Sequence, residues 1–228
     1  MSKLGEIMKT EELSRTFRSG SESVHALKKV SIGFEAGKLV ILRGRSGSGK
    51  TTLINLLGAL DSPDSGKIFY CGKDITKANE AYKNKLRRNK MGFIFQSVAL
   101  ISMMSAYENV EFGLRVAGFS AKDWKKRTEE CLGLVGLSKR MNHYPHEMSG
   151  GEQQRVAIAR AIAHKPDIVF ADEPTAELDT HMGLQVVKLL KSLVEQQGLS
   201  VVMTTHDPGM IEIADYVYTL EDGEIVNA

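Results

Sequence analysis

The sequence predicts an α/β fold, in which a mostly parallel β-sheet is covered on both faces by helices. Short apolar runs at 39–42, 168–171 and 199–205 have the length and composition of buried strands. A glycine-rich loop at 44–49 follows the first run, and the segment 52–60 after it has the pattern of a helix. Because parallel strands need crossover connections, strands that alternate with helices of this length predict a parallel sheet.

The N-terminal part of the chain predicts a smaller antiparallel layer that precedes the main sheet. The segments 31–40 and 65–75 contain short strand-like runs, which Gly37, Gly66 and Gly72 interrupt. Short runs separated by turn residues are typical of antiparallel strands. We therefore expect these segments at the margin of the main sheet.

The middle third of the chain predicts a helical region over about 97–160. A helix over 107–117 is expected to end at Gly118. Ser120 and Asp123 then resemble a capping box at the start of a second amphipathic helix. This region interrupts the alternation of strands and helices, so we expect it to form a separate helical layer.

A last helical pattern runs over 184–194, ahead of the final buried strand. Gly198 is well placed to end that helix. The chain contains no internal repeat and no low-complexity tract. We therefore expect a single domain over 1–228, with a core and β layer made by 5–96 and 161–228 and a helical sub-domain made by 97–160.

The composition is that of a globular protein, with 228 residues of which 42% are hydrophobic and 25% charged. The 30 basic and 28 acidic residues are mixed along the chain and give a formal net charge of +2, so we expect no nucleic-acid partner. We interpret the basic run at 83–90 as a solvated helix face. Cys71 and Cys131 lack the spacing of a zinc site or redox motif and are interpreted as reduced packing residues.

Neither a secretory signal nor a membrane-spanning segment is predicted. The segment 1–17 carries charge throughout, which argues against a signal peptide. The longest apolar stretches are far shorter than the about 20 residues that a helix needs to cross a bilayer. We expect the protein to stay inside the cell, where any task at a membrane needs a second polypeptide.

Residues 44–51 match the spacing G-x-x-x-x-G-K-[ST] of a phosphate-binding loop, between a predicted strand and a predicted helix. Glycines let successive backbone N–H groups and the positive end of the helix point at an anion. Lys50 would reach the β- and γ-phosphates, and the hydroxyl of Thr51 would ligate Mg²⁺. The residues expected to bind ATP here are Gly44, Arg45, Ser46, Gly47, Ser48, Gly49, Lys50, Thr51 and Thr52.

Two carboxylates, Asp172 and Glu173, follow the apolar run at 168–171. Ligands of open α/β sheets bind beside the carboxyl ends of the strands, so both side chains are expected to face the phosphate loop. Asp172 would hold the Mg²⁺ shell, and Glu173 would polarise the water that attacks the γ-phosphorus. A charged, solvated strand end is the alternative, and the phosphate loop upstream favours the functional interpretation.

With these motifs the chain resembles the ATP-binding-cassette (ABC) ATPases, because MSGGEQQR at 148–155 is similar to the signature motif of that family. Further matches follow in the family's order: Gln96 as the glutamine loop, 176–179 as the D-loop and His206 as the switch histidine. The resemblance covers nearly the whole chain. It implies a P-loop NTPase (RecA-like) core with an antiparallel β sub-domain and a helical sub-domain.

The resemblance also implies roles for individual residues. The expected catalytic residues are Lys50, Gln96, Glu173 and His206. The expected Mg²⁺ ligands are Thr51, Gln96 and Asp172. Phe17 falls where the family places an aromatic residue against the adenine ring, and a core position is the alternative for it.

A head-to-tail homodimer with ATP at its interface follows from the same resemblance. Each ATP would touch the phosphate loop of one subunit and, in the other, Ser149, Gly150, Gly151 and Glu152. Independently of the resemblance, this stretch opens a predicted helix whose free N–H groups can bind a γ-phosphate. Asp179 would organise the interface, and loss of the γ-phosphate would open the dimer.

Several segments look most like the subfamily that includes lipoprotein-release, macrolide-export and antimicrobial-peptide-resistance ATPases. The resemblance implies that the chain energises a separate integral membrane permease from the cytoplasmic face of a prokaryotic-type cell membrane. The loop 97–105 is expected to receive the permease through Met103 and Met104, with packing inside the helical sub-domain as the alternative. The permease would read the cargo, so lipoprotein, macrolide, peptide antibiotic, haem or no cargo all stay open.

Two other functions stay open at this point. The chain has the nucleotide motifs of a soluble ABC ATPase that acts on DNA or the ribosome, and of a regulatory ATPase in cell-division signalling. Ribosome-acting members of the family generally carry two cassettes, and DNA-repair members carry long coiled coils. This chain has one cassette and no heptad insertion, which favours the transporter subunit.

Overall fold

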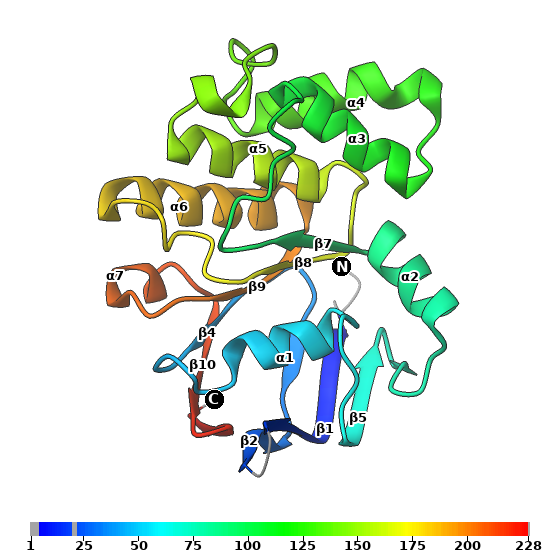
Figure 1. Cartoon of the computed structure of the whole chain (residues 1–228), viewed down its shortest axis with the longest axis vertical. Coiled ribbons are helices and arrows are strands. Elements are labelled where there is room, and N and C mark those ends of the chain that lie inside the picture. Colours follow the sequence, from blue (N-terminus) through cyan, green and yellow to red (C-terminus); the bar gives the residue numbers. More distant parts are fainter. Residues whose placement is uncertain (1–4, 20–21, 228) are drawn as a thin grey trace.

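A six-stranded sheet lies in the middle of the molecule (Figure 1). The computed structural model describes residues 5–19 and 22–227. In spatial order the strands are β11 (Glu224–Asn227), β10 (Tyr216–Glu221), β4 (Leu39–Arg43), β9 (Ser200–Thr204), β8 (Ile168–Ala171) and β7 (Met91–Ile94). All neighbours pair in parallel except β10 and β11, which are antiparallel. The predicted fold class, with a mainly parallel sheet, is confirmed.

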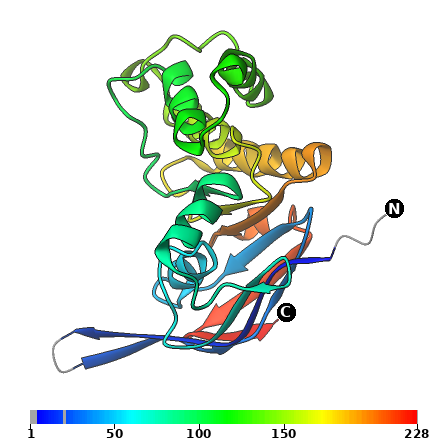
Figure 2. The same cartoon turned by 90° about the vertical axis from the view of Figure 1, so that its right-hand side faces the viewer.

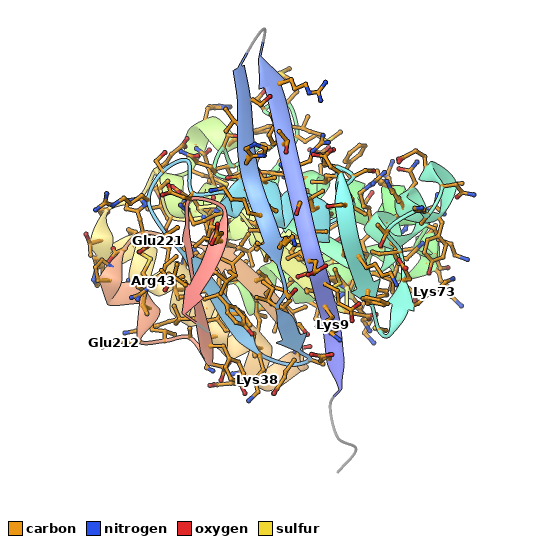
Figure 3. The ribbon with its side chains drawn as sticks, turned by 90° about the horizontal axis from the view of Figure 1, so that it is seen from below. Lys9, Lys38, Arg43, Lys73, Glu212 and Glu221 are labelled. Atoms are coloured by element: carbon orange, nitrogen blue, oxygen red, sulfur yellow. The ribbon has the colours of Figure 1, made fainter. Side chains whose placement is uncertain are left out.

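A second, antiparallel sheet lies below the first in Figure 1. Its strands are β2 (Glu22–Val30), β1 (Glu6–Ser19), β5 (Ser65–Tyr70) and β6 (Lys73–Asp74), in that order, with β3 (Gly33–Glu35) also paired to β1. Figure 2 shows that β1 and β2 continue beyond this sheet as a long hairpin. The view from below in Figure 3 shows the outer face of the sheet, with Lys9 on β1 and Lys73 on β6.

The helices form one layer between the two sheets and a thicker layer above the parallel sheet (Figure 1). They are α1 (Lys50–Leu57), α2 (Glu80–Asn89), α3 (Ala106–Ala117), α4 (Ala121–Leu134), the 3-10 turn η1 (Pro145–Glu147), α5 (Gly150–Ile162), α6 (Thr180–Gln197) and α7 (Pro208–Ile211). α3, α4 and α5 pack together at one end of the molecule, and α6 lies between them and the sheet. Within the described residues, no helix combines the length and the apolar character needed to cross a membrane.

The parallel sheet is buried on both faces. Successive residues of each strand point to opposite sides, and each side packs against a different apolar cluster. In β4, Leu39 and Ile41 belong to the apolar cluster shared with α3 to α6, whereas Val40 and Leu42 belong to the cluster shared with α1 and the antiparallel sheet. All four side chains are almost fully buried. The sheet therefore holds the two layers together and fixes the strand ends that carry the candidate site.

Two predicted helices end close to where they were expected. The helix predicted at 52–60 is α1, which begins two residues earlier, at Lys50. Gly118 and Gly198 end α3 and α6 with φ angles of 73° and 67°, a left-handed conformation that glycine adopts without a steric penalty. α5 runs to Ile162, two residues beyond the limit expected for the helical sub-domain.

The capping box predicted at Ser120 and Asp123 is wrong. Ser120 does precede α4, but its side chain makes no capping hydrogen bond, because the Asp123 N–H donates instead to the Ser120 carbonyl at 2.9 Å. A reciprocal box stands at the start of α3. There the Glu108 N–H donates to Ser105 Oγ at 3.2 Å, and the Ser105 N–H donates to the Glu108 carboxylate at 2.8 Å.

Two surface predictions also need correction. The basic run at 83–90 is not uniformly solvated, because Lys83 is buried and donates to Ser62 Oγ at 2.7 Å. This contact ties α2 to the loop that follows α1. Cys131 is a buried packing residue as predicted, and burial raises the pKa of its thiol to about 11. Cys71 is instead exposed on a turn with a φ of 47°.

Candidate functional site

The carboxyl ends of four parallel strands meet at one edge of the central sheet. The phosphate loop 44–49 follows β4, Gln96 follows β7, Asp172 and Glu173 follow β8, and His206 follows β9. Parallel pairing puts these ends at the same edge, where open α/β sheets bind their ligands. Segments more than 150 residues apart in the chain thereby contribute to one surface.

The phosphate loop fits so closely against its neighbours that two of its positions accept only glycine. A Cβ atom on Gly49 would lie 2.3 Å from the Ala26 carbonyl oxygen, and Gly49 has a φ of 105°. A Cβ atom on Gly44 would lie 2.3 Å from the Leu220 carbonyl oxygen. The loop is therefore held by β2 on one side and by β10 on the other.

Lys50 begins α1 and directs its ammonium group back into the loop. Its Nζ donates to the Gly44 and Arg45 carbonyl oxygens at 2.7 and 3.0 Å, and the residue is buried. Nearby, the Ser48 hydroxyl is buried without a hydrogen-bond partner in the described part of the chain. A positive charge, the free N–H groups of a helix start and an unpaired hydroxyl together suit a phosphate chain.

The acidic pair is joined to the phosphate loop by hydroxyl groups. Thr51 Oγ1 donates to Asp172 Oδ1 at 3.2 Å, and Thr204 Oγ1, at the end of β9, donates to the same oxygen at 2.8 Å. Thr204 Oγ1 also accepts the Glu173 N–H at 2.7 Å. Glu173 has a φ of 43°, an uncommon conformation for a non-glycine residue that is frequent at functional sites.

His206 lies beside Glu173 at the same edge. His206 Nδ1 is 3.7 Å from Glu173 Oε2, a distance within reach of an ion pair when the imidazole is protonated. The His206 side chain is 72% exposed, whereas the Glu173 side chain is 25% exposed. An acid that is partly shielded from water, next to an accessible imidazole, can position and activate a water molecule.

The signature residues form the start of α5. Ser149 caps this helix, because its Oγ accepts the Glu152 N–H at 3.3 Å and its own N–H donates to the Glu152 carboxylate at 2.9 Å. The hydrogen bond from the Ser149 N–H lowers the pKa of Glu152, and Arg140, whose Nε lies 3.1 Å from Glu152 Oε1, adds to that effect. Gly151 packs closely on Met182 of α6. The start of the signature is therefore capped and packed against α6, with Ser149 and Gly150 exposed and Gly151 buried.

Asp179 caps α6 beside the signature. Its Oδ1 accepts the Met182 N–H at 2.9 Å, and its side chain is exposed. A Cβ atom on Gly150 would come within 3.5 Å of Leu178, the residue before Asp179. The D-loop and the signature thus share one exposed surface of the molecule.

Some predicted site residues do not contact the phosphate loop. Among the described residues, no hydrogen bond joins Ser149 or Glu152 to that loop. Gln96 is exposed and lies two residues past the end of β7. The last residue of β7, Ile94, accepts the Asp172 N–H at 2.9 Å through its carbonyl oxygen. Phe17 lies on the β1–β2 hairpin and is 43% exposed, so the alternative of a core position is wrong.

Sequence reasoning did not single out two contributors to the site. The sequence predicts Thr204 only as part of a buried strand, although its place two residues before His206 also suggests a position at the site. Gly223, in the turn between β10 and β11, donates its N–H to the Ser48 carbonyl at 3.1 Å and so helps to hold the phosphate loop in place. No local pattern connects position 223 with position 48.

The chain matches known proteins along almost its whole length. Residues 27–176 match the family model described as ABC transporter. The ABC transporter ATP-binding protein MJ0796 of Methanocaldococcus jannaschii is 40% identical, covering 96% of this chain and 95% of its own. The putative hemin import ATP-binding protein HrtA of Staphylococcus haemolyticus is 40% identical, covering 96% and 98%.

Two further similarities concern a fused protein and a solved structure. The macrolide export ATP-binding/permease protein MacB 2 of Yersinia pestis is 41% identical, and the match covers 96% of this chain but 32% of MacB 2. The structure described as a dimeric post-hydrolysis state of MJ0796 bound to ADP and Pi superposes with a TM-score of 0.87 at 38% identity. That match covers 96% of this chain and 97% of the solved one.

Proposed function

The chain belongs to the ABC transporter family as an ATPase subunit, and on this basis we propose that the strand-end site hydrolyses ATP to energise a separate membrane permease. The observation that carries the proposal is the junction of phosphate loop and acidic pair. Thr51 and Thr204 both donate to Asp172, and Thr204 also holds the backbone of Glu173. Phosphate binding and water activation are thereby combined at one strand edge.

In this proposal the triphosphate lies along the phosphate loop. Backbone N–H groups of the phosphate loop and of the start of α1 bind its oxygens. Lys50, whose Nζ lies within 3.0 Å of the Gly44 and Arg45 carbonyls, pairs with the β- and γ-phosphates. Phe17 provides the adenine with an exposed aromatic face.

The residues at this edge also fit Mg²⁺, which is usually bound by one or two carboxylates together with substrate phosphates. Thr51 Oγ1 and Asp172 Oδ1 lie 3.2 Å apart and supply a hydroxyl and a carboxylate oxygen. We assign both to the ion, together with Gln96, which follows the neighbouring strand. The ion, when bound, neutralises negative charge that develops on the transferred phosphoryl group.

Glu173 acts on the attacking water in this proposal. Its carboxylate is partly shielded, and its backbone is fixed by the Thr204 hydroxyl. The carboxylate accepts a hydrogen bond from the water and takes its proton as the water oxygen bonds to the γ-phosphorus. The bond from the γ-phosphorus to the β–γ bridging oxygen breaks, and ADP leaves with that oxygen. His206, 3.7 Å from Glu173, orients the water and the γ-phosphate.

ATP is bound between two copies of the chain, arranged head to tail. The start of α5 consists of Ser149, Gly150, Gly151 and Glu152, of which Ser149 and Gly150 are exposed. The N–H groups of a helix start favour an anion. These residues complete the site of the partner subunit, and the exposed Asp179 beside them lies at the interface. The dimeric state of the structure named for MJ0796 supports this arrangement.

The permease docks on the loop after Gln96, at the cytoplasmic face of the membrane. Met103 in this loop is 84% exposed, and Phe95, directly before Gln96, is 44% exposed, so apolar side chains lie on the surface here. Met104 is less exposed than Met103, and its carbonyl accepts a hydrogen bond from Asn109. Met103 is therefore the stronger candidate of the two. The fused ATP-binding/permease protein MacB 2 supports a permease partner.

The test is the substitution Glu173→Gln, compared with Glu129→Gln on α4. Removal of the base should lower ATP turnover by about 10²-fold or more while ATP affinity stays close to the parental value. Glu129→Gln changes the same chemical group on an exposed residue outside the proposed site and should keep the parental turnover. Turnover of Glu173→Gln at the parental rate would exclude Glu173 as the base.

A further inference from the structure

The aromatic ring proposed to receive adenine already carries a cation on one side. The Arg15 guanidinium lies over the Phe17 ring, with Cζ 4.8 Å from the ring centroid. Arg15 and Phe17 are two residues apart on β1, so their side chains lie on the same face of the strand. Phe17 is still 43% exposed, which leaves ring surface available to a planar base.

We infer that Arg15 is a positioning residue for adenine: it holds the Phe17 ring in the orientation that stacks on the base of bound ATP. This inference rests on the proposed role of Phe17. Nothing in the family motifs of the sequence includes Arg15, which lies outside the phosphate loop, the signature and the acidic pair.

The guanidinium is itself fixed by two carboxylates of the loop after α1. Arg15 Nε and Nη2 donate to the two carboxylate oxygens of Asp61 at 2.9 and 3.0 Å, which is the bidentate geometry that suits arginine. Arg15 Nη1 donates to Asp64 Oδ1 at 2.9 Å. Three of its nitrogens are thus engaged, so the plane of the group is set independently of any nucleotide.

Asp64 also holds the backbone of the hairpin. Asp64 Oδ2 accepts the Thr16 N–H at 2.6 Å, and the Asp64 N–H donates to the Ser14 carbonyl at 2.9 Å. The hydrogen bond from the Thr16 N–H lowers the pKa of Asp64, and the Arg15 guanidinium adds to that effect. The hairpin on either side of Arg15 is therefore attached to the loop that α1 leads into.

The hairpin also has a fixed relation to the phosphate loop. Arg15 pairs with Leu27 and Thr16 pairs with His25, so Ala26 is an extra residue, a bulge, on β2. The Ala26 carbonyl lies against Gly49, where only glycine fits. Phe17 stands two residues further toward the hairpin tip than this contact. The ring is thus held relative to the loop that binds the phosphates of the same nucleotide.

A ring that is oriented before the nucleotide arrives loses less conformational freedom on binding, which favours affinity. The effect should be specific to ligands that carry a base. Tripolyphosphate has the phosphate chain without adenine, so its affinity should be the same with and without the Arg15 side chain. The ratio of the two affinities therefore separates ring positioning from damage to the phosphate loop.

The experiment measures dissociation constants for ATP and for tripolyphosphate with Phe17→Ala, Arg15→Ala, the double variant and the control Arg18→Ala. Phe17→Ala should weaken ATP binding about tenfold, as expected for loss of stacking on a base. Arg15→Ala should weaken it about threefold, in line with loss of an exposed cation–π contact and its anchor. Tripolyphosphate binding should not change in either variant. Arg18, next to Phe17 but on the opposite face of the strand, should show no effect.

The double variant decides whether Arg15 acts through the ring. If it does, Arg15→Ala should have no further effect on ATP affinity once Phe17 is alanine. Arg15→Lys, which keeps the charge but loses the bidentate contact, should give an intermediate ATP affinity.

The other outcomes would contradict either the stacking of Phe17 on adenine or the positioning role of Arg15. Unchanged ATP affinity in Phe17→Ala would overturn the proposed stacking. Weakened binding in Phe17→Ala with parental affinity in Arg15→Ala would overturn the positioning role alone. Tighter ATP binding in Arg15→Ala would mean that Arg15 occludes the ring, and equal losses for ATP and tripolyphosphate would mean a general structural role.

Discussion

At the scale of single residues, one hydroxyl group organises the acidic edge of the site. Thr204 Oγ1 accepts the Glu173 N–H and donates to Asp172, so it fixes the two acids relative to each other. Glu173 adopts a φ of 43°, a conformation of the kind that costs of the order of 1–3 kcal/mol and persists only where its surroundings enforce it. The Thr204 hydrogen bond is one such restraint.

The first residue-scale prediction concerns Thr204→Val, which removes the hydroxyl and keeps the shape of the side chain. Two partners lose a hydrogen bond, so we expect a loss of about 1–3 kcal/mol in unfolding free energy and a larger fall in ATP turnover than in ATP affinity. Denaturant unfolding and steady-state kinetics measure the two effects.

A matched control is Thr10→Val in β1. Thr10 is also buried, and its hydroxyl likewise accepts one backbone N–H, at 3.1 Å from Ile32, and donates to one oxygen, at 3.0 Å on Val30. It should cost similar stability with turnover per folded molecule unchanged. An equal fall of turnover in both variants would remove Thr204 from the catalytic arrangement.

Residues within a short contiguous motif could be predicted from the sequence, whereas the contacts of Thr204 could not. The phosphate loop places Lys50 and Thr51 by spacing alone, because eight consecutive residues determine its geometry. The partners of Thr204 lie 31 and 32 residues away in the chain. Such a contact depends on the pairing of β8 with β9, which local patterns do not specify.

At the scale of elements, the turn between β10 and β11 supports the phosphate loop. The Gly223 N–H donates to the Ser48 carbonyl at 3.1 Å, and the Gly223 carbonyl accepts the Lys28 N–H at 2.8 Å. The turn thereby connects the loop to β2. Gly223 has a φ of 84°, and a Cβ atom there would lie 2.9 Å from the Ala26 carbonyl oxygen.

The element-scale prediction compares Gly223→Ala with Gly72→Ala. Both glycines have left-handed φ angles, so alanine should cost each about 1–2 kcal/mol of backbone strain. Gly72 has open space around its missing Cβ, whereas Gly223 does not. Gly223→Ala should therefore also weaken ATP binding, which titration with ATP measures. Equal ATP affinity in the two variants would show that the turn does not support the loop.

Elements with a strong local pattern were predicted well, and those that depend on distant partners were not. The strand at 168–171 has four buried apolar residues and was placed without error. β1 is 14 residues long, but its apolar residues are sparse, and it is stabilised by pairing with β2, β3 and β5. Ser120 has the sequence of a helix cap, yet a backbone carbonyl takes the hydrogen bond.

At the scale of the whole molecule, the groups that suit a phosphate stand in two places. The phosphate loop and acidic pair occupy the strand edge, while the signature begins α5 in the helical layer and contacts the D-loop region. Within residues 5–19 and 22–227, no hydrogen bond connects the signature residues 149–152 with the phosphate loop or the acidic pair. A composite site made by two copies accounts for both, and a C2 dimer makes two such sites at once.

The proposed coupling follows from this division. A γ-phosphate held by both copies adds contacts across the interface that ADP does not make, so ATP should bind the closed dimer more tightly than the separate subunits. Hydrolysis removes those contacts. Because the permease would contact the loop around Met103, opening and closing of the dimer could be passed to the membrane partner.

The most direct test of the composite site is the molar mass in solution of Glu173→Gln, measured by light scattering with and without ATP. We expect a dimer that forms only with ATP, because binding persists while hydrolysis is blocked. Adding Ser149→Arg should return the protein to monomer while each monomer still binds ATP, since the change lies in the partner's half of the site. A dimer that survives Ser149→Arg, or none with ATP in Glu173→Gln, would contradict it.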